Sequence, residues 1–388
     1  MLLLVPGPVT THASVRTAAA QDYAPWDNTF RNLVARLCER VLHIAGGRSG
    51  EHAALVLQGC GHFALEASCR TFVINGGRLL IPKTGQYADR FERLATETGR
   101  SAVPLLVQAD RRVDPDRLDA ALAADPTISH VALVYSETAT GIVHDVPVLA
   151  EIAGRHGRRV IIDAVSAFGA MPLELAALPM VDAVVFTTNK CLEGLPGASF
   201  TVARADRLLA SAGQARSWSF DLSDIYTHYQ RAPGAHRFTP AAGVLAAFDV
   251  ALNLFDAEGG QPARLHRYTD NMRALYAGLE EIGLSPSLPL STQGPIVLNV
   301  DAPADPRWDL QAFVEGLKHR GFLISNFYNT PQPSFRLGCI GAITPEDMRL
   351  AVRAIDKTLG ELDIRVRAPL LGQADGRVSN RAADLAVR

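Results

Sequence analysis

Short apolar runs alternate with longer helix-like stretches between about residues 30 and 255 of this 388-residue chain. The run RVIID (159–163) is apolar through its middle, as expected for a strand that is covered on both faces. Alternation of this kind is typical of crossover units, which place successive strands side by side and parallel. The pattern therefore predicts an α/β domain with a mostly parallel sheet flanked by helices. The expected strands are 54–58, 78–82, 102–107, 130–135, 159–163, 183–187 and 198–203, and the expected helices are 61–73, 86–98, 114–124 and 146–156.

After a further expected helix at 241–256, helices and strands are interleaved less regularly. The expected helices there are 262–282, 307–320 and 344–359, and the expected strands are 295–300, 321–324 and 334–337. We therefore expect an N-terminal segment (1–14), a large domain (15–256) and a smaller α+β domain (257–361). Residues 362–388 are polar and weakly periodic, which predicts a mobile tail.

Composition excludes several kinds of partner. The formal net charge is −2 and the basic residues are scattered, so no basic patch indicates nucleic acid or an anionic membrane. The five cysteines are odd in number and lack paired spacing, which argues against a disulfide framework or a metal site. No stretch approaches the ~20 apolar residues that span a bilayer, and the N-terminus MLLLVPGPVT lacks the features of a signal peptide. We expect a soluble cytoplasmic protein without a metal.

A glycine-rich turn in LQGCGHFALEA (57–67) joins an expected strand to an expected helix. Ligands of an open parallel sheet bind at the carboxyl ends of its strands, where this turn lies. Its backbone N–H groups and the positive end of the helix dipole suit a phosphate, through Gly59, Cys60, Gly61 and His62. The alternative is a plain tight turn, which this motif taken by itself favours.

Two ionisable residues end other expected strands. Asp163 closes VIID, and a carboxylate that leaves a buried strand costs free energy unless a cation or donor meets it. Its alternative role is a cap for the following AVSAF segment. Lys190 follows VVFTT among small and apolar residues, where partial burial lowers the pKa of an amine and makes it a nucleophile toward carbonyl compounds. The alternative is a structural lysine whose amine reaches solvent from the strand end.

Two further segments supply groups that orient or bind a ligand. SETATG (136–141) follows the expected strand VALVY, and its hydroxyls and carboxylate suit a bound ring, although Ser and Thr are also common loop residues. Arg336 lies inside an apolar strand of the smaller domain, and a guanidinium matches carboxylate or phosphonate oxygens in bidentate fashion. Its alternative is a partner for a buried acid.

Together these features fit one cofactor. A phosphate-binding turn, a strand-end aspartate and a strand-end lysine 27 residues later (190 − 163) are what pyridoxal phosphate requires. The lysine binds the cofactor's aldehyde, and the aspartate keeps the pyridine nitrogen protonated so that the ring accepts electrons. Tyr87, in KTGQYADR, can supply the aromatic face on which the ring stacks.

The chain resembles the class V, fold-type I pyridoxal-phosphate aminotransferases, and among them the phosphonate transaminases. The resemblance runs from LLLVPGPVTT through LVLQGCGHFALEA, SETATG, IIDAVSAFG and TTNKCLEGLPG to RFTP and FRLGCIG, nearly to residue 361. It implies a pyridoxal 5'-phosphate enzyme of the fold-type I architecture, with the N-terminal segment at the active site. It also implies a homodimer with shared active sites, and transfer of an amino group from 2-aminoethylphosphonate to pyruvate.

The resemblance also assigns roles to residues. Lys190 matches the lysine joined to the cofactor, and Asp163 matches the partner of the ring nitrogen. Arg336 matches the arginine that binds the acidic group of the substrate, with Pro6 and Gly7 beside it. The other implied cofactor residues are Gly59, Cys60, Gly61, His62, Tyr87, Thr138 near the ring oxygen, Asn189, and Thr239 contributed by the neighbouring subunit.

Three segments depart from the phosphonate transaminases. Cys60 and His62 stand where serines are expected, Pro240-Ala241-Ala242 replaces hydroxyl residues, and ISNFYNTPQPSFR differs from an expected lysine-bearing loop. These departures leave open another aminophosphonate, or a transaminase of the alanine–glyoxylate or serine–pyruvate type. The remaining alternatives are a pyridoxal-phosphate lyase that uses Cys339 and a non-catalytic protein that binds a phosphate ligand.

Overall fold

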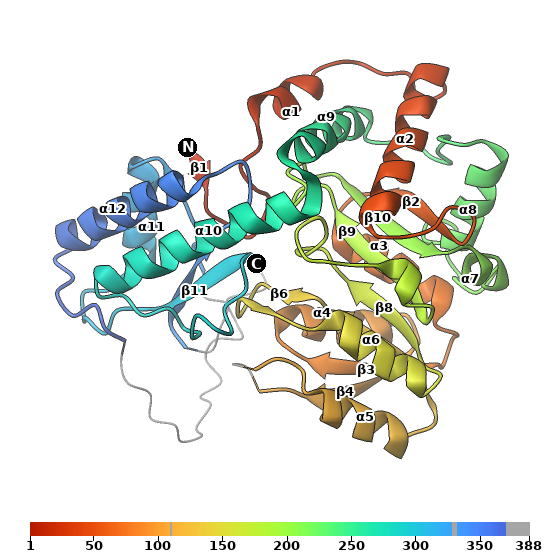
Figure 1. Cartoon of the computed structure of the whole chain (residues 1–388), viewed down its shortest axis with the longest axis horizontal. Helices are drawn as coiled ribbons and strands as arrows, with labels where there is room; N and C mark the ends of the chain where they lie inside the picture. The colour runs from red at the N-terminus through yellow and green to blue at the C-terminus, as the bar shows by residue number, and fades with distance from the viewer. Residues whose placement is uncertain (109–110, 328–331, 370–388) are drawn as a thin grey trace.

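A seven-stranded sheet forms the centre of the computed structural model, which describes residues 1–108, 111–327 and 332–369 (Figure 1). The strand order is β2 (His52–Gln58), β10 (Ala198–Arg204), β9 (Val181–Thr187), β8 (Arg159–Asp163), β5 (Ile128–Val134), β3 (Arg78–Lys83) and β4 (Ser101–Leu106). β10 runs antiparallel to both of its neighbours, β2 and β9, whereas the other neighbouring strands are parallel. The predicted α/β fold with a mostly parallel sheet is confirmed.

Both faces of this sheet are buried, because successive strand residues pack into two different cores. Ile161 and Val185 belong to one core, and Ile162 and Val184 belong to the other. The first core is completed by α3 (Gly61–Phe72), α4 (Gln86–Glu97), α7 (Ala205–Ala210) and α8 (Leu222–Arg231), and the second by α2 (Asn28–Ile44), α5 (Pro115–Ala124), α6 (Val146–Arg155) and α9 (Ala242–Glu258). Burial on both sides accounts for the continuous apolar runs in the strand sequences.

A separate hydrophobic core lies in the C-terminal region, which we define as residues 260–369. Helix α10 (Gly260–Glu281) extends from the side of the central sheet into this region, beside α11 (Leu310–His319) and α12 (Pro345–Glu361) (Figure 1). The strands there are β11 (Val297–Asp301), which pairs with β13 (Ser334–Gly338), and β12 (Phe322–Leu323), which pairs with β1 (Leu2–Leu3). The first residues of the chain therefore pack with its last part. The domain division at residue 256 stays a prediction.

Several elements were not expected from the sequence. They are β1, α1 (Ala13–Ala18), α2, the short 3-10 helix Leu175–Ala177, α7, α8, and the hairpin formed by β6 (Ser136–Glu137) and β7 (Ile142–Val143). Helices α2 and α8 had readable start signals, since Asp27 and Asp221 accept hydrogen bonds from the first-turn N–H groups. The hairpin had none, because two-residue strands are too short to show a period.

Residues 362–369, the first part of the predicted mobile tail, pack against the C-terminal region, and the mobility of the tail stays a prediction. Ile364 is 3% exposed and belongs to the C-terminal core, and the N–H of Ala304 donates to the carbonyl of Ala368 (N···O 2.9 Å). One apolar anchor and a backbone hydrogen bond leave no periodic signal in a polar sequence, so composition alone missed them. The rest of the expected tail, residues 370–388, lies outside the described residues.

Candidate active site

Lys190 and Asp163 lie at the same edge of the central sheet. Asp163 is the last residue of β8, and Lys190 follows the end of β9, which runs parallel to β8 and is hydrogen-bonded to it. All seven residues of β9 are buried, so the strand delivers Lys190 from the interior of the protein. The carboxylate and the amine are close enough for the charge of each to affect the pKa of the other. Sheet topology therefore brings these two predicted residues together.

The amine of Lys190 is partly buried and donates to the carbonyl of Pro6 (Nζ···O 2.8 Å). Burial lowers the pKa of this amine to about 8; the charge of Arg336 acts in the same direction, whereas Asp163 opposes it. More of the neutral amine is therefore present near neutrality than in a lysine exposed to water. A neutral amine is the form that acts as a nucleophile or a base.

Asp163 is 4% exposed and has a pKa raised to about 6 by burial. The backbone N–H of Val165 donates to its Oδ1 (2.9 Å), and this hydrogen bond and the charge of Lys190 both oppose the rise. The sequence left open a capping role, and the bond from Val165 shows that Asp163 does cap the following turn. The same carboxylate still has a second oxygen with which to bind a donor from a ligand.

The N-terminal segment reaches Lys190 although 183 positions separate it from Gly7 (190 − 7). Gly7 has φ +144°, and a Cβ on it would lie 2.5 Å from the lysine Nζ. No side chain fits there, so the glycine permits the close approach. The segment is held by the C-terminal region, since Gly338 N–H donates to Leu4 O (2.8 Å) and Leu4 N–H donates to Leu323 O (2.8 Å).

A buried carboxyl group, Glu137, completes this edge of the sheet and was missed as a site residue. Its side chain is 0% exposed and accepts hydrogen bonds from the N–H groups of Tyr87 (3.2 Å) and Ala139 (3.1 Å). Burial raises its pKa to about 7, and the two hydrogen bonds oppose that rise. The signal was present in SETATG, since a carboxylate directly after a buried strand needs a reason. Through its bond to Tyr87, Glu137 fixes the start of the helix that carries the expected ring-stacking side chain.

Arg336 comes to the same place from the C-terminal region. It lies in β13, is 5% exposed, and donates from Nη1 to the carbonyl of Thr138 (2.8 Å). Its Nη2 lies 3.5 Å from the hydroxyl of Ser325, and its guanidinium carbon lies 5.7 Å from the ring centroid of Phe327. Burial lowers the pKa of this arginine, while the charge of Glu137 raises it. These hydrogen bonds run to a carbonyl and a hydroxyl, whereas the alternative role required a carboxylate partner.

The glycine-rich turn leads into α3 as expected. Gly59 has φ +109°, and its N–H donates to Gly197 O (2.9 Å), so this amide is already used within the chain. Cys60 is the N-cap residue and is exposed, as is His62. Gly61 begins the helix, and a Cβ there would lie 2.4 Å from Val165 Cγ2. The first-turn N–H groups of Gly61 and His62 have no acceptor within a helix and are the amides left for an anion.

The remaining predicted residues lie nearby. Thr239 is exposed and its carbonyl accepts a hydrogen bond from the side chain of Gln58, the last residue of β2. Asn189 is partly buried in the turn before Lys190. The sheet edge and the turn before α3 therefore bring together residues of the large domain, and Arg336 and the N-terminal segment join them from elsewhere.

A buried hydroxyl group without a hydrogen-bond partner indicates that these residues fit pyridoxal phosphate. The hydroxyl of Thr138 is fully buried and has no hydrogen-bond partner among residues 1–108, 111–327 and 332–369. A buried polar group without a partner costs about 1–3 kcal/mol, which a ligand oxygen at this place would offset. An amine with lowered pKa and a carboxyl group on the adjacent strand stand beside it. In the same ranges, no group of three or more His, Cys, Asp or Glu side chains is arranged to hold a metal ion.

Comparison with known proteins gives one consistent result. Residues 31–292 match the family model described as aminotransferase class-V. The chain is 40% identical over 363 residues to a 2-aminoethylphosphonate–pyruvate transaminase of Pseudomonas fluorescens, covering 94% of this chain and 98% of the relative. It is also 40% identical over 366 residues to the protein of the same name from Burkholderia ambifaria, covering 94% and 97%. Among solved structures, a pyridoxamine–pyruvate aminotransferase from Mesorhizobium loti superposes with a TM-score of 0.85 at 22% identity, covering 94% of this chain and 93% of the other.

Proposed function

The chain belongs to the class V aminotransferase family, and we propose that it moves the amino group of 2-aminoethylphosphonate to pyruvate. The products are phosphonoacetaldehyde and alanine, and the exchange is reversible. The donor and acceptor are supported by the relatives at about 40% identity, which carry that activity in their names and align over nearly their whole length. We propose pyridoxal 5'-phosphate as the cofactor, held by the residues that meet at the carboxyl edge of the sheet.

One observation carries the proposal: Lys190, Asp163 and Arg336 come from three different strands or strand ends and interact electrostatically at one place. When bound, pyridoxal phosphate supplies an electron sink for the charge that develops on the donor carbon. Lys190 Nζ takes the proton from that carbon and returns it elsewhere as general base and acid. Asp163 holds a proton at the ring nitrogen, which is the role its second oxygen leaves open.

Arg336 binds the acidic group of the substrate in this proposal. Its planar guanidinium suits both the phosphonate of the donor and the carboxylate of pyruvate, so one side chain serves both half-reactions. The contact with Thr138 O orients the guanidinium toward the sheet edge, on the side where Lys190 lies. Pro6 and Gly7 close the same space from the N-terminal segment and exclude bulk water around the amine.

The amides of Gly61 and His62 would bind the cofactor phosphate, Thr138 would offer its hydroxyl to the cofactor, and Tyr87 would offer an aromatic face to it. Cys60, Gly59 and Asn189 shape the surrounding turns. We propose a homodimer in which Thr239 of one subunit adds to the phosphate site of the other. The exposure of Thr239 beside Gln58 and of the aromatic side chain Trp218, at 73%, supports a covering partner. Sedimentation of the purified protein tests this, since a monomer at micromolar concentration contradicts it.

We also propose a cytoplasmic location and small-molecule substrates, without nucleic acid or membrane partners. The described helices include none that is long and apolar enough to cross a bilayer. The lyase alternative needs a reactive thiol, but Cys339 is buried and burial raises its pKa to about 12. A thiol in that state is protonated near neutrality and does not serve as a nucleophile.

The testing experiment is a visible absorption titration of the purified holoenzyme. Addition of 2-aminoethylphosphonate should remove the yellow absorbance of the bound cofactor, and pyruvate should restore it. A yellow protein that ignores this donor but responds to alanine, serine or another aminophosphonate refutes the donor and keeps the transaminase. A colourless protein that takes up no cofactor refutes the cofactor assignment.

A further inference from the structure

Arg264 and Tyr268 both donate to Cys191 O in the turn that follows Lys190, and the same turn is closed by Glu193. Its backbone N–H donates to the carbonyl of Lys190 (2.9 Å), which closes the turn. Glu193 has φ +56°, a left-handed conformation that non-glycine residues adopt only when surrounding contacts impose it. Its side chain is 6% exposed, and its carboxylate accepts hydrogen bonds from Arg267 and Tyr268. The position of Lys190 therefore depends on what binds the Glu193 carboxylate.

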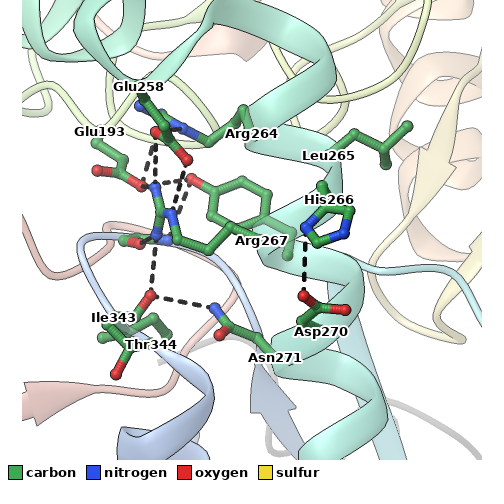
Figure 2. Close-up of polar contacts among 12 residues, drawn as sticks. Glu193, Glu258, Arg264, Leu265, His266, Arg267, Asp270, Asn271, Ile343 and Thr344 are labelled. Carbon is green, nitrogen blue, oxygen red and sulfur yellow. Dashed lines mark hydrogen bonds and ion pairs between the residues drawn. The ribbon is translucent and has the colours of Figure 1, made fainter.

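Glu193 belongs to a largely buried ionic cluster, the Glu193 cluster, formed with Glu258, Arg264, Arg267 and Tyr268 (Figure 2). Arg267 Nη2 and the Tyr268 hydroxyl both donate to Glu193 Oε1, each at 2.7 Å. Glu258 accepts from Arg264 (Nε···Oε2 2.7 Å) and from Arg267 (Nε···Oε1 2.8 Å). Two carboxylates and two guanidinium groups balance in charge, and Arg264 is only 1% exposed. Such a cluster is stable only when its members stay together, because removing one leaves a buried charge unpaired.

The same cluster also forms hydrogen bonds with the backbone of the segment that follows Arg336. Arg267 Nη1 donates to the carbonyls of Gly341 (2.6 Å) and Ile343 (2.9 Å), three and five residues after Gly338, where the pairing with β11 ends. Asn271, one turn further along α10, donates to Cys339 O (3.0 Å) and to Ile343 O (3.2 Å). The close-up shows Arg267 between the Glu193 carboxylate and this backbone (Figure 2). One side chain thus spans the turn that carries Lys190 and the segment that continues the strand of Arg336.

We propose that Glu193 and Arg267 are positioning residues that hold Lys190 and Arg336 at a fixed separation. The inference rests on the proposed function for the role of Arg336 as the acidic-group clamp. Transamination needs the donor carbon beside the amine while its acidic group is bound, so the spacing of the two groups selects the substrate length. Hydrophobic contacts would allow the lysine turn to shift slightly relative to the segment after Arg336. The hydrogen bonds of Arg267 to Glu193 and to two carbonyls are directional and oppose such a shift.

The experiment compares Glu193→Gln with the matched control Glu258→Gln. Each variant removes one carboxylate from the same cluster and leaves both guanidinium groups. Of the two carboxylates, only Glu193 belongs to the lysine turn itself, whereas Glu258 reaches it through Arg264, which donates to Cys191 O. For the donor that the wild type uses, Glu193→Gln should raise KM about tenfold with a smaller change in kcat, and Glu258→Gln should stay within about twofold of wild type. Equal changes in the two variants would show a merely structural role and overturn the proposal.

A second readout needs neither donor nor turnover. In the cofactor-free protein, the rate at which cyanate carbamylates Lys190 is followed against pH by peptide mass spectrometry. A loosened turn exposes the amine to water, so the midpoint should move upward by about half a pH unit or more in Glu193→Gln and stay in place in Glu258→Gln. An unmoved midpoint in Glu193→Gln overturns the positioning proposal, whichever donor the wild type uses. Rejection of 2-aminoethylphosphonate by the wild type would instead contradict only the proposed function.

Arg267→Lys covers the case in which Glu193→Gln does not fold. This variant keeps the positive charge but replaces two separate donor nitrogens, which bind the two carbonyls and Glu193, with one, so the forked geometry is lost. It should raise the donor KM and shift the carbamylation midpoint in the same directions as Glu193→Gln. Wild-type values for both quantities in a folded Arg267→Lys protein would overturn the proposal.

Discussion

The two ends of strands β8 and β9 differ in how their buried charged groups are compensated. At the amino ends a carboxylate forms ion pairs with arginines, whereas at the carboxyl ends the described residues form no such ion pairs. Asp182, near the start of β9, is 0% exposed and accepts hydrogen bonds from Arg159 (Nε···Oδ1 2.8 Å) and Arg207 (Nε···Oδ1 3.0 Å). His130 Nε2 lies 3.3 Å from its other oxygen. Burial by itself raises the pKa of Asp182, but these hydrogen bonds and charges outweigh it and the pKa is lowered.

At the carboxyl ends, burial outweighs the hydrogen bonds and charges that oppose it. Asp163 has a pKa raised to about 6, Glu137 one raised to about 7, and Lys190 one lowered to about 8, each mainly through burial. Each group is thereby brought near the pH at which it can gain or lose a proton. The comparison teaches that the protonation of a buried carboxyl group depends on its partners. Asp182 has guanidinium partners and stays charged, whereas Asp163 and Glu137, within the described residues, accept hydrogen bonds only from backbone N–H groups.

Lys190→Met is the largest test of this comparison. Loss of the amine should reduce the transamination rate by at least about 1,000-fold, while the thermal unfolding midpoint does not fall, because an unpaired buried amine adds nothing to stability. Steady-state assays and thermal melts measure the two effects. Lys83→Met is the matched control, since Lys83 is ion-paired with Asp89 and Glu92 and should lose little activity. A Lys190→Met protein with a tenth of the wild-type rate would break the assignment.

Glu137→Gln tests the pH dependence of the unpaired end. Between its ordinary pKa of 4.5 and its folded pKa of about 7, the folded chain binds more protons at Glu137 than the unfolded chain does. The free energy of unfolding of the wild type, relative to Glu137→Gln, should therefore be highest below pH 4.5 and decrease by about 3 kcal/mol up to pH 7. Urea unfolding of the cofactor-free proteins across that range gives the difference. A difference that stays constant with pH would contradict the contrast with Asp182.

Asp163→Asn should lower the rate about 100-fold while the protein keeps its cofactor, because an amide cannot hold a proton at the ring nitrogen. Cofactor content from the absorption spectrum and kcat from the alanine-forming assay separate the two effects. If the variant instead loses cofactor in proportion to activity, Asp163 serves binding and not electron withdrawal.

Asp182→Asn should lower the stability of the protein and leave its rate nearly unchanged, the opposite of what is expected for Lys190→Met. Replacing the paired carboxylate leaves Arg159 and Arg207 without their shared acceptor charge, and about 2 kcal/mol of unfolding free energy should be lost. Both arginines are partly exposed and can turn to water, which limits the loss. The rate at low temperature should stay within about twofold of wild type, since the site is at the opposite end of the strands. A large rate loss with unchanged stability would remove the distinction between the two ends.

Arg336→Lys is the smallest expected effect and concerns the substrate alone. An ammonium replaces the bidentate fork with a point charge, so KM for the phosphonate donor should rise about tenfold with cofactor content unchanged. Arg320→Lys, a surface change at a residue paired with Glu361, supplies the control. Unaltered donor kinetics would send the search for the acidic-group clamp to another residue.

Most of the longer strands and helices could be predicted, because the pattern of apolar and polar residues in a segment reflects its own surroundings. β8 was predicted at its observed bounds, and Lys190 and Asp163 were found because parallel strands with one hand of connection must end at one edge. The carboxylate of SETATG was noted together with its hydroxyls, but Glu137 was not assigned a role, since its complete burial and its bond to Tyr87 N–H depend on tertiary structure.

The sequence by itself determined the sheet, the residues at its carboxyl edge and the family to which they point. Only the tertiary structure decided that Pro6 receives the lysine amine, that Asp163 is unpaired while Asp182 is paired, and that Arg267 joins Glu193 to the segment after Arg336. The reason is physical. The spacing of apolar residues along the sequence depends only on whether a segment is a strand or a helix. The residues that a side chain contacts come from distant segments, and close packing determines how those segments approach one another.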